Sequence, residues 1–146
     1  MSRPRRDLER QYRAPVTRLQ RRRFSEPDNV RDVLLGRLET YVMGDFRFGR
    51  SVLEPGWRWS ESIKPIARTE LCEAHHIGLC LAGSCRIQMR GGAELLIEAG
   101  QFYEVPPGHD ATVVSDEAWV TIDWSPAPPS RDRKVAPSIG SWQRYS

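Results

Sequence analysis

Short runs of β-branched and aromatic residues, separated by turn residues, fill the chain from about residue 39 to residue 125. Glycine, proline or acidic residues interrupt the runs at intervals of roughly ten residues, the rhythm of an all-β sandwich or barrel. Arg90-Gly91-Gly92-Ala93 predicts a tight hairpin, because glycine supplies the positive φ angle that such turns need. The runs are RLETYVM, FRFGRSVL, CRIQMR, AELLIEA, QFYEVP, ATVVS and AWVTIDW. They predict an all-β fold with no convincing helix between residues 39 and 125.

The 146 residues are enough for one domain that folds around its own core. Just ahead of the strand-like region, Ser25 as a cap, Pro27 in the first turn and Asp28 predict a short helix or a single turn.

Composition divides the chain into three parts: a basic, Arg-rich arm at residues 1–23, a β-domain at residues 24–125 and a Pro/Ser-rich extension at residues 126–146. We expect both terminal parts to be extended or disordered, because neither offers enough apolar surface to bury.

The net charge of +3 conceals a strong asymmetry. The arm holds nine arginines against two acidic residues, so it carries +7 and the remainder of the chain carries −4. Such an arm can contact nucleic acid through its phosphates. We favour a solvated segment instead, since no zinc finger, basic zipper or helix-turn-helix pattern accompanies the arginines.

Apolar and cysteine content indicate the compartment. The longest nearly unbroken apolar stretch, Ile77 to Gly83, is too short to cross a bilayer, and no apolar region follows the basic N-terminus as in a secretory signal. Three cysteines cannot all pair within one chain. We therefore expect a cytoplasmic protein, without membrane contact, whose cysteines are thiols.

Two of the three histidines stand side by side in CEAHHIGLCLAG, residues 72–83, where a thiol and two imidazoles begin an apolar run that ends in glycine. A second stretch, AGQFYEVPPGHDATVV, follows after one hairpin. In it Gly100 precedes Pro106-Pro107-Gly108 with the spacing G-x5-P-x-G.

This pair of stretches resembles the two motifs of the cupin superfamily, over about residues 39–125. PGWRWS and PPGHD are similar to a subgroup of cupin domains found alone or attached to bacterial signalling proteins. The resemblance implies a jelly-roll β-barrel whose interior commonly holds a metal ion. It implies much less about activity, because cupins include enzymes, storage proteins and ligand-sensing domains.

The chain departs from the usual cupin ligand set of three histidines and one glutamate. Counting back from Gly83 puts His76 at the glutamate position, and Cys72 and Glu70 at two of the histidine positions. In the second motif the histidine position holds Ala111, preceded by His109 and Asp110.

These residues still form a plausible metal set. Residues 70, 72 and 76 share a face of a strand, which could be the barrel interior, and the barrel would bring His109 from its opposite wall. We expect Cys72, His76 and His109 to hold a divalent metal, with Glu70 as a fourth ligand if the chain bends. Zinc accepts thiolate, imidazole and carboxylate, whereas iron(II) is the less comfortable alternative beside a thiol.

Each residue also has a purely structural interpretation. Cys72 could be a small buried hydrophobe, His76 a core histidine bonded to a carbonyl, and Asp110 a cap in a proline-glycine turn. Cys80 and Cys85 are assigned to packing. His75, the neighbour of His76, is expected to point outward.

Aromatic residues are the second candidate feature. Trp57 and Trp59 would share one face of a strand, with Arg58 on the other. They either fill the barrel or form a stacking wall for a planar or apolar ligand, and Tyr103 could line the same pocket. Trp119 and Trp124 are assigned to packing.

Three functions follow. The first is a metal-dependent enzyme that acts on a small organic molecule, with Glu70 or Asp110 transferring protons. The second is a non-catalytic module that binds a small ligand and reports its presence to a partner. The third makes the arm a nucleic-acid tether for a small regulator. By analogy with cupins, and because exposed sheet edges need cover, we expect a homodimer.

Overall fold

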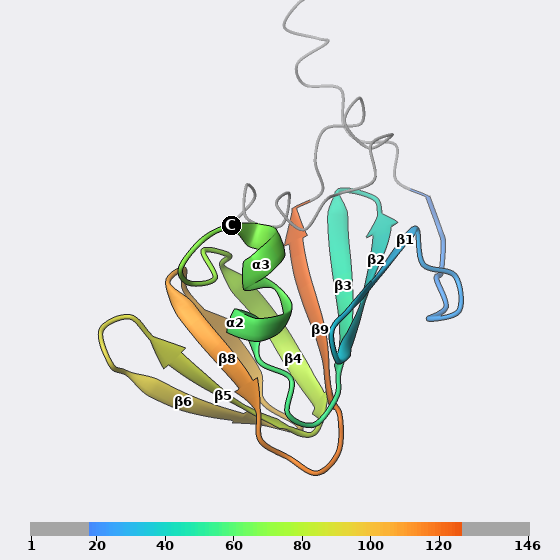
Figure 1. Ribbon diagram of the computed structural model, residues 1–146. Helices are drawn as coiled ribbons and strands as arrows, with labels where there is room; N and C mark the ends of the chain where they lie inside the picture. The colour runs from blue at the N-terminus through green and yellow to red at the C-terminus, as the bar shows by residue number, and fades with distance from the viewer. Residues whose placement is uncertain (1–17, 127–146) are drawn as a thin grey trace, which may run out of the picture.

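The computed structural model describes residues 18–126, which form two antiparallel β-sheets facing each other across the core (Figure 1). The larger sheet contains, in spatial order, β1 (Asn29–Val33), β2 (Gly36–Met43), β3 (Phe46–Leu53), β9 (Trp119–Pro126), β4 (His76–Ala82) and β7 (Phe102–Val105). The smaller sheet contains β6 (Glu94–Glu98), β5 (Ser84–Met89) and β8 (His109–Val113). Most of the predicted arm and extension, residues 1–17 and 127–146, lies outside the described residues.

The all-β jelly-roll prediction is confirmed. From β4 onward the chain passes between the two sheets, because β4, β7 and β9 belong to the larger sheet while β5, β6 and β8 belong to the smaller one. Side chains alternate along these strands, as the burial of β8 shows residue by residue. Alternation therefore gives each sheet one face toward a common interior.

The passage from β4 to β5 requires a glycine. Gly83 alone separates the two strands, and its φ angle is +73°. A Cβ atom there would also meet the backbone of Ala118 and Trp119, at 2.9 Å from the Cα of Trp119. The glycine that ends the first motif is thus explained by both conformation and space.

Of the short helix or single turn predicted at Ser25, the helix is absent: residues 24–25 form a turn. Asp28 instead leads into β1, which pairs with β2 along its whole length. The Asp28 carboxylate accepts a hydrogen bond from the N–H of Val42 at 2.8 Å, so it extends the sheet rather than capping a helix. Pairing with a neighbouring strand overrides the local helix signal.

Two one-turn helices, α2 (Trp59–Ser62) and α3 (Lys64–Ala67), occur where no helix was predicted. The first of them, α2, lies beside β8 (Figure 1), and the Asp110 carboxylate accepts a hydrogen bond from the N–H of Ser60 at 3.1 Å. The N–H of Val113 donates to the carbonyl of Trp57, so the segment before α2 also runs along β8. Trp57 and Trp59 consequently do not lie on a single strand.

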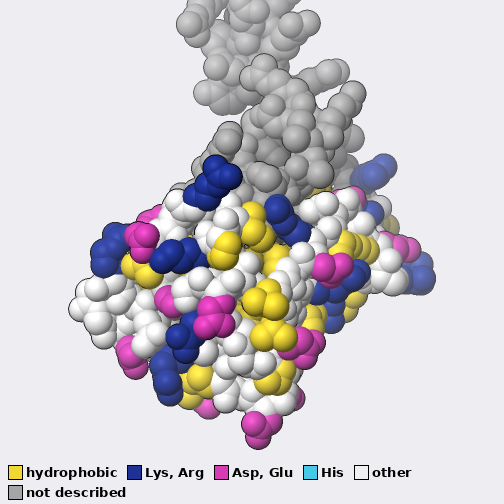
Figure 2. Space-filling model, viewed as in Figure 1, with side chains coloured by type: hydrophobic (Ala, Val, Ile, Leu, Met, Phe, Trp, Pro, Cys, Tyr) yellow, Lys and Arg dark blue, Asp and Glu magenta, His cyan; other side chains and the backbone are white. Residues whose placement is uncertain are grey.

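The described surface mixes charges of both signs. Basic and acidic side chains are interspersed over the face in Figure 2 instead of being grouped by sign. Such a face lacks the single-sign stripe that characterises nucleic-acid contact. Within residues 18–126, no helix has the length and apolar character needed to cross a membrane.

Candidate metal site

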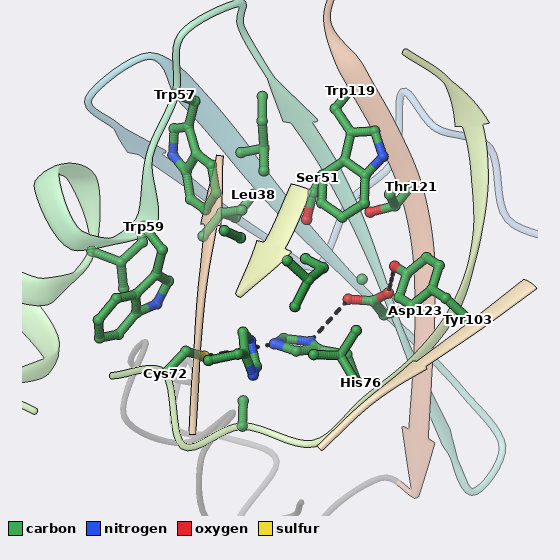
Figure 3. A pocket seen from close by; sticks show the side chains of 18 of the residues that line it. Leu38, Ser51, Trp57, Trp59, Cys72, His76, Tyr103, Trp119, Thr121 and Asp123 are labelled. Atoms are coloured by element: carbon green, nitrogen blue, oxygen red, sulfur yellow. Dashed lines mark hydrogen bonds and ion pairs between the residues drawn. The ribbon is translucent and has the colours of Figure 1, made fainter. Parts of the chain in front are cut away.

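A cavity of about 120 Å³ lies between the two sheets. Its walls come from β2, β3, β4, β7, β8 and β9, from the segment that contains α2, and from the chain around residue 72. Figure 3 shows Trp57, Trp59 and Leu38 along one side, Ser51, Thr121 and Asp123 along the other, and Cys72 and His76 at one end.

Cys72 reaches this cavity because the chain bends between residues 72 and 76. It is not part of a continuous strand with His76, where β4 begins, but forms a single antiparallel bridge with His109. The N–H of Cys72 donates to the His109 carbonyl at 2.8 Å, and the N–H of Gly108 donates to the Cys72 carbonyl at 2.7 Å. The bridge sets Cys72 beside the first residue of β8. The bend places its Sγ atom 3.7 Å from Nε2 of His76.

The two imidazoles present corresponding nitrogen atoms to the thiol. Nδ1 of His109 lies 2.7 Å from the carbonyl oxygen of Pro106, and Nδ1 of His76 lies 3.3 Å from a carboxylate oxygen of Asp123. An acceptor at Nδ1 fixes the proton there and leaves Nε2 with a free lone pair. Both rings are therefore held in the tautomer that suits a metal ligand at Nε2.

The three ligand atoms are spaced as a metal ion requires. Those of Cys72, His76 and His109 all lie within 4.8 Å of one another, and the two rings are 5.2 Å apart between centroids. Zinc bonds of about 2.0–2.3 Å in a tetrahedral arrangement put neighbouring ligand atoms about 3.5 Å apart. The group fits a divalent metal with small side-chain adjustments, and three protein ligands would leave a fourth position open toward the cavity.

Without a metal, the same atoms form an ion pair. Burial opposes ionisation of the Cys72 thiol, but hydrogen bonds from His109 and His76 outweigh it and lower its pKa to about 6. Burial likewise disfavours the charged form of His76, but Asp123 and Cys72 raise its pKa to about 10. At neutral pH this end of the cavity thus contains a thiolate beside an imidazolium.

Asp123 was missed in the sequence analysis. It projects from β9 into the cavity, accepts a hydrogen bond from the hydroxyl of Tyr103, and holds His76 with its other oxygen. Burial and, to a smaller extent, the neighbouring Asp123 carboxylate raise the pKa of Tyr103, so its hydroxyl remains a donor. One signal was available: Asp123 has the same parity as Trp119 and Thr121 in AWVTIDW, and a carboxylate on the buried face of a strand needs a partner.

Gly78 leaves the space in which this network forms. A Cβ atom at this position of β4 would lie 2.6 Å from the Tyr103 hydroxyl oxygen and 2.6 Å from the Ile122 carbonyl oxygen, and closer still to Asp123. Glycine within a strand often marks such a close approach. Side-chain and backbone atoms of β7 and β9 therefore occupy the space beside this residue.

Two predicted proton-transfer residues lie away from the three ligand atoms. Glu70 has a side chain 90% exposed that pairs with Lys64 at 2.9 Å, so the structure does not bring it to the cavity as a fourth ligand or a base. Asp110 accepts hydrogen bonds from the N–H groups of Ser60 and Ala111 and is committed to holding α2 against β8. Glu70 lies in the bends at residues 69–71 that precede Cys72, so it does not share a strand face with Cys72 and His76.

The aromatic candidates all line the cavity. Trp57, Trp59 and Tyr103 are 5–8% exposed, and the Tyr103 ring lies 6.0 Å from that of Trp119. His75 points outward and pairs with Glu104. Cys80 and Cys85 are fully buried and lie outside the residues that line the cavity.

The thiolate can be observed directly. In metal-free protein, absorbance at 240 nm should report one cysteine ionising with a midpoint near pH 6, because the neighbouring imidazoles stabilise the Cys72 thiolate. The other thiols will not contribute near neutral pH, since burial raises the pKa of Cys80 and raises that of Cys85 to about 12. Cys72→Ser should abolish the transition. A first ionisation above pH 8 in the unaltered protein would contradict this account.

Comparison with known proteins bears on the fold alone. No family model and no curated protein matches the chain. Among solved structures, the chain is similar to an oxalate decarboxylase from Lactobacillus farciminis in a formate complex, with 16% identity and a TM-score of 0.51. That match covers 72% of this chain and 32% of the other, so the chain spans about a third of that protein's length.

Two further matches have lower TM-scores. An RmlC-like cupin from Shewanella frigidimarina shares 14% identity over 78% of this chain and 94% of its own, with a TM-score of 0.49. A Cupin 2 conserved barrel domain protein from Salinispora arenicola shares 18% identity over 64% and 79%, with a TM-score of 0.47. The facing antiparallel sheets, the two sequence motifs and the likeness to solved structures together identify the fold of this chain as that of the cupin superfamily.

Proposed function

We propose that this chain is a metal-binding cupin that binds, and in the presence of a suitable substrate transforms, a small organic molecule in its interior. The observation that carries the proposal is the convergence of Cys72, His76 and His109 at the end of a largely apolar cavity. Buried ionisable groups of this kind are costly to keep unless they are paired or coordinate a metal.

Zinc is the metal that this donor set favours. A thiolate and two imidazoles are ligands that zinc takes readily, and a site with three protein ligands keeps a position for water or substrate. Iron(II) is the alternative, but it more often uses two histidines and a carboxylate. When bound, the metal would supply a Lewis acid able to polarise an oxygen atom of the ligand.

The chain's own residues have distinct roles in this proposal. Cys72, His76 and His109 hold the metal; Asp123 keeps the proton on Nδ1 of His76, and the Pro106 carbonyl does the same for His109. Trp57, Trp59 and Tyr103 line the space that a ligand would occupy and exclude water from it.

A non-catalytic ligand-binding module is the second candidate. It is favoured by the positions of Glu70 and Asp110, one exposed and the other bonded to backbone N–H groups, which leave neither free for proton transfer in the cavity. Asp123, too, is already engaged by His76 and Tyr103. Turnover of the bound molecule separates the two candidates.

The homodimer belongs to the same proposal. Three apolar side chains of β4 and β7 are exposed: Ile77 is 40%, Leu81 45% and Phe102 74% exposed, with the charged Glu104 beside them on β7. An apolar face of this kind marks an interaction surface, and a second copy of the chain is the partner we propose for it.

Metal content tests the proposal. Protein purified anaerobically, or loaded with zinc and then desalted, should hold one metal ion per chain by elemental analysis. His76→Ala, His109→Ala and Cys72→Ala should each lose most of it, because each removes one of only three ligands. His75→Ala is the matched control, since His75 is adjacent in sequence but outside the group. Retention of metal by the His76 and His109 variants would overturn the proposal.

The contact between His76 and Asp123 leads to a separate prediction. Gly78→Ala should weaken zinc binding about 10- to 100-fold, as loss of an outer carboxylate partner typically does, by displacing Asp123. Gly91→Ala, where an added Cβ meets nothing within 4 Å, should leave the affinity unchanged. The affinity is measured by competition with a chromophoric chelator, with circular dichroism to monitor folding.

Should Gly78→Ala unfold the chain, Asp123→Asn gives the same test without added volume. Wild-type zinc affinity in a folded Asp123→Asn protein would show that Asp123 does not support the metal ligand.

A further inference from the structure

The lining of the cavity restricts the charge of its ligand. None of the described residues that line it is a lysine or an arginine. Of its two acidic residues, Glu39 has its carboxylate engaged by Tyr41 at 2.5 Å, Arg37 at 2.9 Å and Arg50 at 3.2 Å. Asp123 is therefore the one carboxylate among the described lining residues that faces the site at the end of the cavity.

With a divalent metal bound, the charges at the Cys72 and His76 end of the cavity would balance before any ligand enters. A divalent metal would bring two positive charges, which the Cys72 thiolate and the Asp123 carboxylate offset, while the two histidines bind as neutral ligands. This step rests on the proposed function. An anionic ligand would add a charge that no lysine or arginine of the cavity compensates, and an uncompensated charge is expensive to bury.

The volume of the cavity restricts the size of the ligand. An apolar protein cavity of about 150 Å³ accommodates a benzene molecule. The present cavity, at about 120 Å³, is somewhat smaller, so a single six-membered ring is the largest ring system that it can take. Fused rings and sugars linked in pairs exceed it.

The two long walls differ in polarity, which orients such a ring. Trp57, Trp59 and Leu38 form an apolar side against which a flat face can pack, as Figure 3 shows. On the other side the hydroxyl groups of Ser51 and Thr121 stand beside the Trp119 ring, and the Thr121 residue is only 1% exposed. A buried hydroxyl of this kind can hydrogen-bond an oxygen atom of a ligand.

We propose that the cavity binds an uncharged, single-ring molecule that carries one hydroxyl or carbonyl oxygen, with the ring against Trp57 and Trp59 and the oxygen toward the hydroxyl wall or the metal. Carboxylates and phosphorylated compounds of the same size are excluded.

Benzyl alcohol and benzoate are matched probes, because they share the ring and differ in charge. Calorimetric titration of the zinc-loaded full chain should give a dissociation constant for benzyl alcohol at least about tenfold lower than for benzoate, the cost of burying an uncompensated charge. 2-Naphthylmethanol, with two fused rings, should bind at least about tenfold more weakly than benzyl alcohol. Equal or tighter binding of benzoate, or no binding of benzyl alcohol at millimolar concentration, would overturn the inference.

Two variants at one position locate the binding event. Ser51→Leu adds side-chain volume to the cavity and should weaken benzyl alcohol binding at least about tenfold, whereas Ser51→Ala removes only the hydroxyl and should change it by less than about threefold. Both should still hold one zinc per chain, because Ser51 is not a ligand. Unchanged binding in a folded Ser51→Leu protein would place the probe outside the cavity and overturn the inference.

Zinc content measured on the same samples separates the two proposals. A chain that holds zinc but prefers benzoate would refute the ligand class and leave the metal site standing. A chain that holds no zinc yet prefers benzyl alcohol would refute the metal site and retain the ligand class, since the lining without lysine or arginine remains.

Discussion

The antiparallel bridge between Cys72 and His109 is the interaction on which the site depends. Its reciprocal hydrogen bonds, at 2.8 Å and 3.2 Å, and a third from the N–H of Gly108 to the Cys72 carbonyl at 2.7 Å attach an otherwise irregular segment to the start of β8. The bridge brings Cys72 beside His109, and the bend that follows brings His76, at the start of β4, within 3.7 Å of the thiol. The larger sheet supplies His76 and Asp123, the smaller sheet supplies His109, and the bridged segment supplies Cys72.

The burial of these ionisable side chains limits the states in which they are stable. A thiolate, an imidazolium and a carboxylate in a largely apolar cavity are tolerated only as paired groups or around a metal, and removing one partner of a buried pair costs about 3–5 kcal/mol. The arrangement at Cys72, His76 and Asp123 satisfies either condition. With a metal the Nε2 atoms become ligands, and without it the same atoms share a proton with sulfur.

Sequence patterns predicted most of the fold because alternation and turn residues are local signals. Apart from β4, which occupies the apolar stretch that ends at Gly83, the strands from β2 onward overlap the β-branched and aromatic runs. The hairpin at residues 90–93 forms as its glycines indicate. The helix predicted after Ser25 failed because pairing of β1 with β2 outweighs a cap-like local sequence. The short helices α2 and α3 escaped detection because four residues are too few to show a period.

The sequence predicted some of the site residues. The others could be assigned only from the three-dimensional path of the chain. Motif spacing singled out Cys72, His76 and His109, but the same spacing, read as one extended strand, also included Glu70. Residues 69–71 are bends that lead into the Cys72 bridge, and Glu70 is at the surface in this irregular segment; such bends are not encoded in strand parity. Strand parity could have placed Asp123 on the buried face, but its partner His76 is 47 positions away in sequence, so the pairing of β4 with β9 is needed to bring the two together.

The central claim is that sulfur and two imidazole nitrogens bind one ion. X-ray absorption spectroscopy of the zinc-loaded full chain tests it most directly. We expect one sulfur at about 2.3 Å and two imidazole nitrogens at about 2.0 Å, with a light atom completing the shell. A zinc shell without sulfur, or with a single imidazole, would contradict the account.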